Sequence, residues 1–192
     1  MRAPRDLAVC VFCGARDGTA PAYRALAADT GRRVAARGWT VVYGGGDVGL
    51  MGALAGGALE AGGKVVGIIP RALLREERGK HEITRLEVVD TMAVRKERMI
   101  ALADVFLALP GGLGTLDELF EVLTLRQIGL HRKPIGILDH AGYFASLLAA
   151  IEGMADHGFV AREHIDHLLV MDSVEPLLEA LAGSVSGPAA PA

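Results

Sequence analysis

The chain has 192 residues and a mass of 20.1 kDa, which is the size of one ordinary α/β domain. Its hydrophobic content of 51% is enough for a sizeable core and excludes intrinsic disorder. The 20 basic and 23 acidic residues give a net charge of −3, which argues against a nucleic-acid partner held by bulk electrostatics. No apolar run approaches the ~20 residues of a membrane span, and the N-terminal segment lacks the pattern of a signal peptide. We therefore expect a cytoplasmic protein without nucleic-acid or membrane partners.

Along the chain, apolar runs alternate with segments of helical periodicity, which is the pattern of β-α-β units around a parallel sheet. Strands are predicted at residues 7–13, 39–43, 64–69, 86–89, 105–109, 134–139 and 167–171. Helices are predicted between Pro21 and Gly38 and at residues 50–61, 91–103, 115–129, 143–156 and 174–182. Together these elements predict a Rossmann-like, doubly wound α/β fold with a mostly parallel sheet and helices on both faces.

The domain organisation is simple, because the sequence contains neither an internal repeat nor a linker. Residues 1–183 are expected to form a single domain, and residues 184–192 a disordered tail. The charge-rich connection at residues 70–82 is the longest one and is expected to be a mobile flap over a site.

Cys10 and Cys13 form a C-x-x-C motif, which raises the question of redox chemistry or a metal site. Both lie in the first predicted strand, where an odd separation directs the two side chains to opposite faces of the sheet. The chain has no second cysteine pair to complete a zinc site. We interpret both residues as small buried hydrophobic side chains.

The first glycine-rich loop follows the second predicted strand. Gly44, Gly46 and Gly49 match the spacing G-x-G-x-x-G, which lets backbone amides and a helix N-terminus approach a phosphate. Gly44, Gly45 and Gly46 are therefore candidate phosphate-binding residues. A dinucleotide site also needs an acidic residue at the end of the next strand, where this chain reads IIPR at residues 68–71. A mononucleotide or sugar phosphate therefore fits better than NAD.

The second glycine-rich loop, PGGLGTLDE, follows the fifth predicted strand. Because Gly111, Gly112 and Gly114 carry no side chains, backbone amides and the Thr115 hydroxyl are able to converge on a phosphate at the start of the next helix. The same segment also fits a capping box, in which Thr115 is the N-cap and Glu118 ties down its own helix terminus. The residues alone leave both interpretations open.

Helical periodicity predicts which face of the helix from Thr115 meets the core. The expected core stripe consists of Leu116, Leu119, Phe120 and Leu123. Glu118 points away from this stripe, on a face that it shares with Glu121, Val122 and Leu125. A face that mixes acidic and aliphatic side chains suits a cleft or a subunit interface.

Two cations are expected to point inward from the helix at residues 91–103. The predicted apolar stripe of this helix consists of Met92, Met99, Ile100, Leu102 and Ala103. Arg95 and Lys96 project close to the centre of that stripe, whereas Glu97 and Arg98 point to the opposite side. Because an unpaired buried charge is costly, the pattern favours an anionic ligand over the alternative of snorkelling side chains.

These motifs together resemble the LOG ("Lonely Guy") family. The resemblance is carried by GGGDVGLMG at residues 44–52, the pair Arg95-Lys96 and PGGLGTLDE at residues 110–118, and it extends over most of the chain. Members are cytokinin riboside 5′-monophosphate phosphoribohydrolases, many of which were labelled possible lysine decarboxylases. The resemblance implies a homodimer that hydrolyses the N-glycosidic bond of N6-substituted AMP to free base and ribose 5-phosphate. It also implies that Arg95 and Glu118 are the catalytic pair.

The expected substrate is therefore a nucleoside monophosphate. Lys96 and Arg95, with the amides of Gly112, Gly114 and Thr115 beside Gly111, are expected to anchor the 5′-phosphate or the leaving side of the sugar. Glu118 is expected to stabilise the positive charge that develops on the sugar. Glu121 lies one helical turn further on and is either a second carboxylate of the site or part of the capping network.

Two departures from the family pattern affect substrate preference. Ala93 stands where the family commonly has histidine before Arg-Lys, and Ala15-Arg16 stands where it usually has serines. A decarboxylase is disfavoured because pyridoxal phosphate needs a Schiff-base lysine, and of the four lysines only Lys96 lies near the site. The six histidines show no metal spacing, and His164 and His167 are expected at the surface, so neither a metal nor another cofactor is implied. The alternatives are a general AMP nucleosidase and a non-catalytic carrier of a phosphorylated ligand such as molybdenum cofactor.

Overall fold

The computed structural model describes residues 6–74 and 82–185. Its strands form one seven-stranded sheet in the order β4-β3-β2-β1-β5-β6-β7, and all neighbours are parallel. The strands are β1 (Ala8–Phe12), β2 (Thr40–Tyr43), β3 (Lys64–Pro70), β4 (Arg85–Val89), β5 (Val105–Ala108), β6 (Ile135–Leu138) and β7 (Leu168–Met171). The predicted Rossmann-like α/β fold is confirmed, with a sheet that is parallel throughout.

The helices lie close to their predicted positions. They are α1 (Pro21–Ala36), α2 (Gly49–Glu60), α3 (Met92–Leu102), α4 (Leu113–Gln127), α5 (Ala145–Asp156), α6 (Arg162–Ile165) and α7 (Val174–Val185), with 3-10 turns η1 (Arg71–Leu73) and η2 (His140–Gly142). The short helix α6 was not predicted, and it contains His164, which was expected in a loop. Helix α7 continues through two residues of the predicted tail, and the rest of that tail lies outside the described residues.

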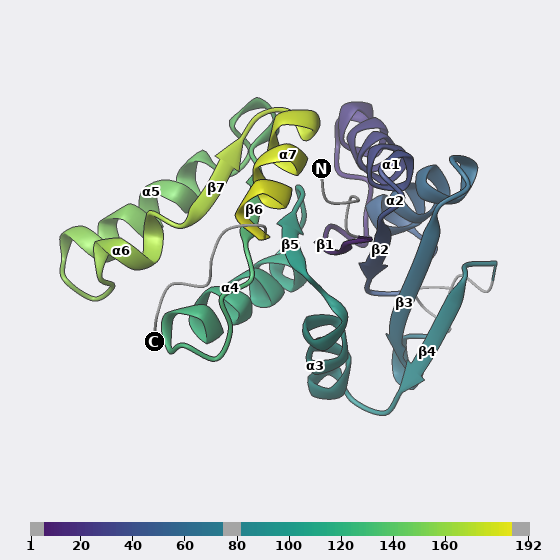
Figure 1. Cartoon of the computed structure of the whole chain (residues 1–192), viewed down its shortest axis with the longest axis horizontal. Helices are drawn as coiled ribbons and strands as arrows, with labels where there is room; N and C mark the ends of the chain where they lie inside the picture. The colour runs from purple at the N-terminus through teal and green to yellow at the C-terminus, as the bar shows by residue number, and fades with distance from the viewer. Residues whose placement is uncertain (1–5, 75–81, 186–192) are drawn as a thin grey trace.

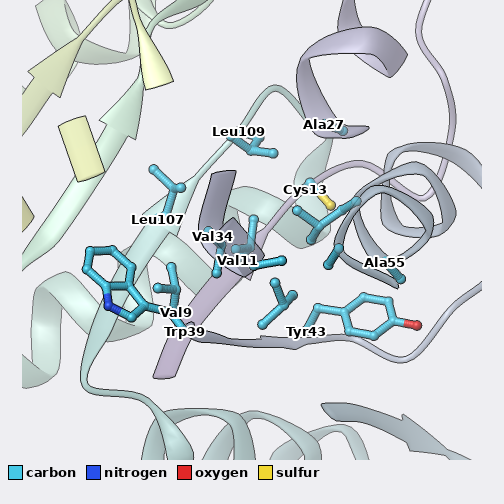
Figure 2. Close-up of a cluster of buried hydrophobic side chains, with 14 of the residues drawn as sticks. Val9, Val11, Cys13, Ala27, Val34, Trp39, Tyr43, Ala55, Leu107 and Leu109 are labelled. Atoms are coloured by element: carbon cyan, nitrogen blue, oxygen red, sulfur yellow. The ribbon is translucent and has the colours of Figure 1, made fainter. Parts of the chain in front are cut away.

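Two hydrophobic clusters lie on opposite faces of the sheet, as the fold class requires. One packs β-strand side chains against α1, α2 and α7, and part of it is shown in Figure 2. The other packs against α3, α4 and α5, on the other side of the sheet (Figure 1). Cys13 belongs to the first cluster and Cys10 to the second, which confirms that the two thiols point to opposite faces.

Other sequence expectations have mixed outcomes. Most of the predicted flap lies outside the described residues. In the part that is described, residues 71–73 form the turn η1. Of the two histidines expected at the surface, His167 is exposed and His164 is partly buried. Among the described residues, no helix combines the length and apolar character needed to cross a membrane.

An ionic contact between α7 and α1 gives the fold a pH dependence. Glu175 accepts hydrogen bonds from Arg37 and, at 2.7 Å, from Arg33. These hydrogen bonds lower the pKa of Glu175 to about 2, and the one from Arg37 has the larger effect. The guanidinium of Arg37 also lies 5.4 Å from the ring centroid of Trp39, the single tryptophan of the chain.

We expect Glu175→Gln to destabilise the protein at neutral pH and to have a shrinking effect as the pH falls. A carboxylate whose pKa is lower in the folded than in the unfolded state stabilises the fold above its unfolded value of ~4.5, and this contribution is lost between there and about 2. Urea unfolding followed by Trp39 fluorescence at about pH 7, 4 and 2.5 measures the effect. The exposed Glu179 of the same helix provides the control variant Glu179→Gln. An equal loss of stability at all three pH values would contradict the prediction.

Candidate functional site

The candidate site lies where the strand order reverses. The chain winds from β1 outward to β4 and then returns to β5 on the other side of β1, so the loops after β1 and β5 diverge at the carboxyl edge of the sheet. Backbone hydrogen bonds nevertheless join these loops to the start of α2. The Gly14 N–H donates to the carbonyl oxygen of Pro110 at 3.2 Å, and the Leu50 N–H donates to that of Gly14 at 3.0 Å. The predicted elements therefore bring both motif regions to one edge.

A cavity of about 560 Å³ opens between these loops. Its walls come from the loop at residues 13–18, the first turn of α2, Arg95 of α3, and residues 110–115 with Glu118. Val11, Tyr23, Gly44 and Tyr143 also line the cavity. The volume lies within the ~300–1,000 Å³ range of small-molecule sites.

The second glycine loop forms the start of α4. This helix begins at Leu113 with Gly112 as its N-cap, and no side chain caps it. Thr115 is thus the third helical residue, so the capping-box interpretation of Thr115 and Glu118 is wrong. Because the first N–H groups of a helix lack intrahelical carbonyl partners, the turn from Gly112 to Thr115 presents amide donors beside the cavity.

Gly111 is required by the close approach of the loop to its neighbours. A Cβ atom at this position would lie 2.0 Å from the Thr115 hydroxyl oxygen and 2.8 Å from the Gly14 nitrogen. The Thr115 side chain is itself buried, with 3% of its surface exposed. Gly111, Gly112, Gly114 and Thr115 all line the cavity, as the predicted site requires.

Glu118 reaches the cavity from the second turn of α4. The fully packed stripe of this helix consists of Thr115, Leu119 and Val122, whereas the predicted stripe members Leu116, Phe120 and Leu123 are partly buried. The prediction that Val122 lies on the face of Glu118, outside the core stripe, is therefore wrong, because its side chain packs in the core. Helix α4 is rotated relative to the predicted face, which brings Glu118 toward the sheet edge.

Arg95 points inward from α3, as its helical position predicted, and only 5% of its surface is exposed. Its Nε donates to the carbonyl oxygen of Ile68 at 3.1 Å, and its Nη2 donates to that of Gly44 at 2.8 Å. The charge is thus held by carbonyl dipoles at the carboxyl ends of β2 and β3. One guanidinium therefore joins two strand ends and lines the cavity.

The first glycine loop makes room for this arginine. A Cβ atom at Gly44 would lie 1.9 Å from Arg95 Nη2, so the guanidinium occupies the space that any other residue would need. Gly44 lines the cavity, whereas Gly45 and Gly46 are buried and do not belong to the lining. At Gly45 the backbone has φ = 80°, and a Cβ atom there would lie 3.0 Å from the Cβ of Ile69 and 3.2 Å from the backbone of Ile68.

Lys96 and Glu121 lie outside the cavity lining. The Lys96 ammonium forms ion pairs with Asp117 at 3.0 Å and Glu121 at 3.1 Å, which joins α3 to α4. Partial burial lowers the pKa of Lys96, but the hydrogen bonds of Asp117 and Glu121 outweigh it, so the pKa is raised. The predicted phosphate ligand Lys96 is therefore engaged by two carboxylates outside the cavity lining.

Cys13 is one of the residues that line the cavity, and its thiol is buried. Burial and then the nearby Glu118 carboxylate raise its pKa well above the ordinary value, whereas Arg95 opposes the shift. The thiol is therefore protonated at neutral pH and is not a nucleophile. Within the parts of the chain that the structure describes, no three metal-ligating side chains gather.

Among the lining residues that were not predicted as site residues are Arg16, Tyr23 and Tyr143. Arg16 is exposed on the loop after β1, Tyr23 lies in the first turn of α1, and Tyr143 follows η2. The rings of Tyr23 and Tyr143 meet edge to face, with centroids 5.6 Å apart. A signal for Tyr143 was present in the sequence, because it follows the strand β6 at the same carboxyl edge as the second glycine loop.

Taken together, these features define an α/β protein of the Rossmann-like class with a glycine-lined cavity at the switch point of its sheet. Comparison with known proteins is more specific. A family described as possible lysine decarboxylase matches residues 51–181. The cytokinin riboside 5′-monophosphate phosphoribohydrolase of Mycobacterium tuberculosis is 44% identical over 179 residues, which are 93% of this chain and 95% of that protein. The cytokinin riboside 5′-monophosphate phosphoribohydrolase LOG7 of Arabidopsis thaliana is 44% identical over 153 residues, which are 80% of this chain and 70% of that protein. The chain therefore belongs to the family of these phosphoribohydrolases, the LOG family.

Solved structures support the fold independently of sequence. The molybdenum cofactor binding protein of Rippkaea orientalis superposes with a TM-score of 0.72 at 22% identity, covering 96% of this chain and all of that protein. The molybdenum cofactor carrier protein of Chlamydomonas reinhardtii gives a TM-score of 0.70 at 22% identity, covering 95% of this chain and all of that protein. At this level of identity, the two structures establish the shared architecture alone.

Proposed function

We propose that the protein is a phosphoribohydrolase that cleaves the N-glycosidic bond of N6-substituted adenosine 5′-monophosphates. Water adds to C1′ while the bond from C1′ to the base nitrogen breaks, and the products are the free base and ribose 5-phosphate. The observation that carries the proposal is that the Glu118 carboxylate and the uncapped first turn of α4 line the same cavity. An anion site and a negative side chain thus lie within one ligand's reach. The near-full-length identity to phosphoribohydrolases supports the same activity.

The division of roles follows from charge. The amides from Gly112 to Thr115 face a bound 5′-phosphate at the helix start. The sugar then extends toward Glu118, where positive charge spreads over C1′ and the ring oxygen as the bond breaks. The carboxylate stabilises this charge and accepts a proton from the attacking water. Binding energy from the phosphate holds the sugar in place for attack.

Arg95 contributes in a different way from a simple phosphate ligand. Its hydrogen bonds to Ile68 and Gly44 fix the guanidinium at the cavity wall before any ligand binds. A fixed positive charge near the developing negative charge of the leaving base needs no reorganisation during the reaction. Arg16, at the mouth of the cavity, supplies a second cation that is exposed and able to turn toward the substrate.

The family description as a possible lysine decarboxylase does not fit the residues of this cavity. Pyridoxal phosphate requires a lysine within reach for a Schiff base. No lysine of the described chain lines the cavity, and the nearby Lys96 is paired with Asp117 and Glu121. We therefore assign pyridoxal phosphate no role in the reaction, in which water is the second substrate.

Two further properties belong to the proposal. We propose a cytoplasmic homodimer, as the family resemblance implies.

A general AMP nucleosidase and a carrier of phosphorylated ligands share the same cavity requirements. A passive carrier of an anion gains nothing from a carboxylate beside the phosphate site, so Glu118 favours the enzyme.

The proposal predicts that nucleoside monophosphates release free base and that nucleosides do not. Without the phosphate, the substrate lacks the binding energy that orients its sugar. Chromatography of incubations with AMP, N6-isopentenyl-AMP and adenosine measures the free base formed, and the ratio of the two nucleotide rates gives the preference for the N6 group. Equal turnover of adenosine and AMP would contradict the assignment of the phosphate site. No release from either nucleotide would favour the carrier.

A further inference from the structure

Tyr143 makes a hydrogen bond that the proposed reaction does not yet use. Its hydroxyl donates to the carbonyl oxygen of Gly111 at 2.6 Å, across 32 residues of sequence. The acceptor belongs to the second glycine loop, and both residues line the cavity. The hydrogen bond thus acts on the backbone at the entrance to α4.

The carbonyl groups of this loop all have donors within the protein. Pro110 accepts the Gly14 N–H at 3.2 Å, Gly112 accepts the Leu116 N–H at 3.2 Å, and Gly111 accepts the Tyr143 hydroxyl. Of these three donors, only that of Tyr143 is a side chain. In a trans peptide the C=O and the following N–H point in opposite directions, and no cis peptide occurs in the described chain. Holding the Gly111 carbonyl toward Tyr143 therefore turns the Gly112 N–H the other way.

We propose that Tyr143 is a positioning residue for phosphate recognition. It fixes the Gly111–Gly112 peptide so that the amide, rather than the carbonyl oxygen, faces the anion. Two glycines in succession leave this peptide free to rotate, because neither residue restricts its neighbouring torsions. A carbonyl oxygen turned toward the 5′-phosphate would repel it. The proposal rests on the proposed function only in taking a phosphate as the ligand of this turn.

The local structure holds the Tyr143 ring in position for this role. The next residue, Phe144, is buried, and its N–H donates to the Asp139 carboxylate at 2.7 Å. The Tyr143 ring meets Tyr23 and Phe144 edge to face, with centroids 5.6 and 4.9 Å apart. Ala141, two residues earlier, has φ = 54°, the sole positive φ of a non-glycine residue in the described chain. Such strain persists only where the surrounding structure enforces it.

The test is Tyr143→Phe, which removes the hydroxyl and keeps the ring. A single hydrogen bond changes a binding constant by a factor of a few to about ten. We therefore expect the KM for AMP to rise about 5- to 10-fold and kcat to stay within about twofold. Titration calorimetry with ribose 5-phosphate is expected to show a similar rise in its dissociation constant. The inhibition constant of adenosine, which lacks the phosphate, is expected to stay unchanged. The thermal midpoint of the ligand-free variant is expected to equal that of the wild type.

These measurements separate the inference from the proposed function. If the wild type releases no base from AMP, the proposed function fails, but the ribose 5-phosphate titration still tests Tyr143. An unchanged dissociation constant for ribose 5-phosphate in Tyr143→Phe would overturn the inference. An equal loss of affinity for adenosine and for ribose 5-phosphate would also overturn the inference, because Tyr143 would then have a general packing role.

Discussion

Glu118→Gln is expected to lower kcat by about 10²- to 10⁴-fold, which is the usual contribution of a general base. Glutamine keeps the size of the side chain but removes the charge that stabilises the sugar cation and the site that accepts the proton from water. Substrate binding is expected to change little, because the phosphate is held by the first turn of α4. Release of base from AMP and N6-isopentenyl-AMP, measured at several substrate concentrations, separates kcat from KM.

Two other carboxylates serve as comparisons for this variant. Glu121 lies one turn further along α4, but its carboxylate pairs with Lys96 outside the cavity lining, so Glu121→Gln is expected to have a much smaller effect on kcat. Glu97→Gln changes an exposed side chain of α3 and controls for net charge. If Glu121→Gln lowers kcat as much as Glu118→Gln, Glu121 is the second carboxylate of the site. Full activity of Glu118→Gln would exclude Glu118 from the chemistry.

The sequence predicted the fold well because buried parallel strands and amphipathic helices leave strong local patterns. Every predicted strand is present, and the rule that ligands bind at the carboxyl ends of strands placed both glycine loops at one edge. The inward direction of Arg95 also followed from helical periodicity, since residues on one face of a helix share one environment.

Features that depend on tertiary pairing were predicted less well. Periodicity directed Lys96 inward but carried no information about Asp117 and Glu121, which α4 brings to it. The start of α4 was predicted two residues late, because Thr115 and Glu118 match the spacing of a capping box. In the structure the N-cap is Gly112, and the helix begins at Leu113. The position of Tyr143 after β6 indicated only that it lies at the carboxyl edge of the sheet. Its hydrogen bond was not predictable, because the acceptor lies 32 residues away and no spacing rule joins an aromatic residue to a distant carbonyl oxygen.

Arg95 combines a structural and a functional role, and its replacement is expected to affect both. Its two buried hydrogen bonds end on carbonyl groups at the ends of β2 and β3. Leaving a buried acceptor unsatisfied costs about 1–3 kcal/mol. Glu118→Gln, by contrast, leaves both carbonyl acceptors paired with Arg95 and is expected to lower stability less. The two catalytic candidates are therefore distinguishable by stability as well as by activity.

Arg95→Ala is expected to abolish detectable base release and to lower the free energy of unfolding by about 2–4 kcal/mol, since two carbonyl acceptors lose their donor. Urea unfolding followed by Trp39 fluorescence measures the stability, and free-base chromatography measures the activity. Arg98→Ala is the matched control on the same helix, because its guanidinium pairs with Glu87 near the surface, where an ion pair contributes about 0–1 kcal/mol. Arg95→Lys keeps the charge but cannot reproduce both hydrogen bonds, so it is expected to be inactive as well. An active Arg95→Ala would limit Arg95 to a structural role, and unchanged stability would contradict the bridge between the two strand ends.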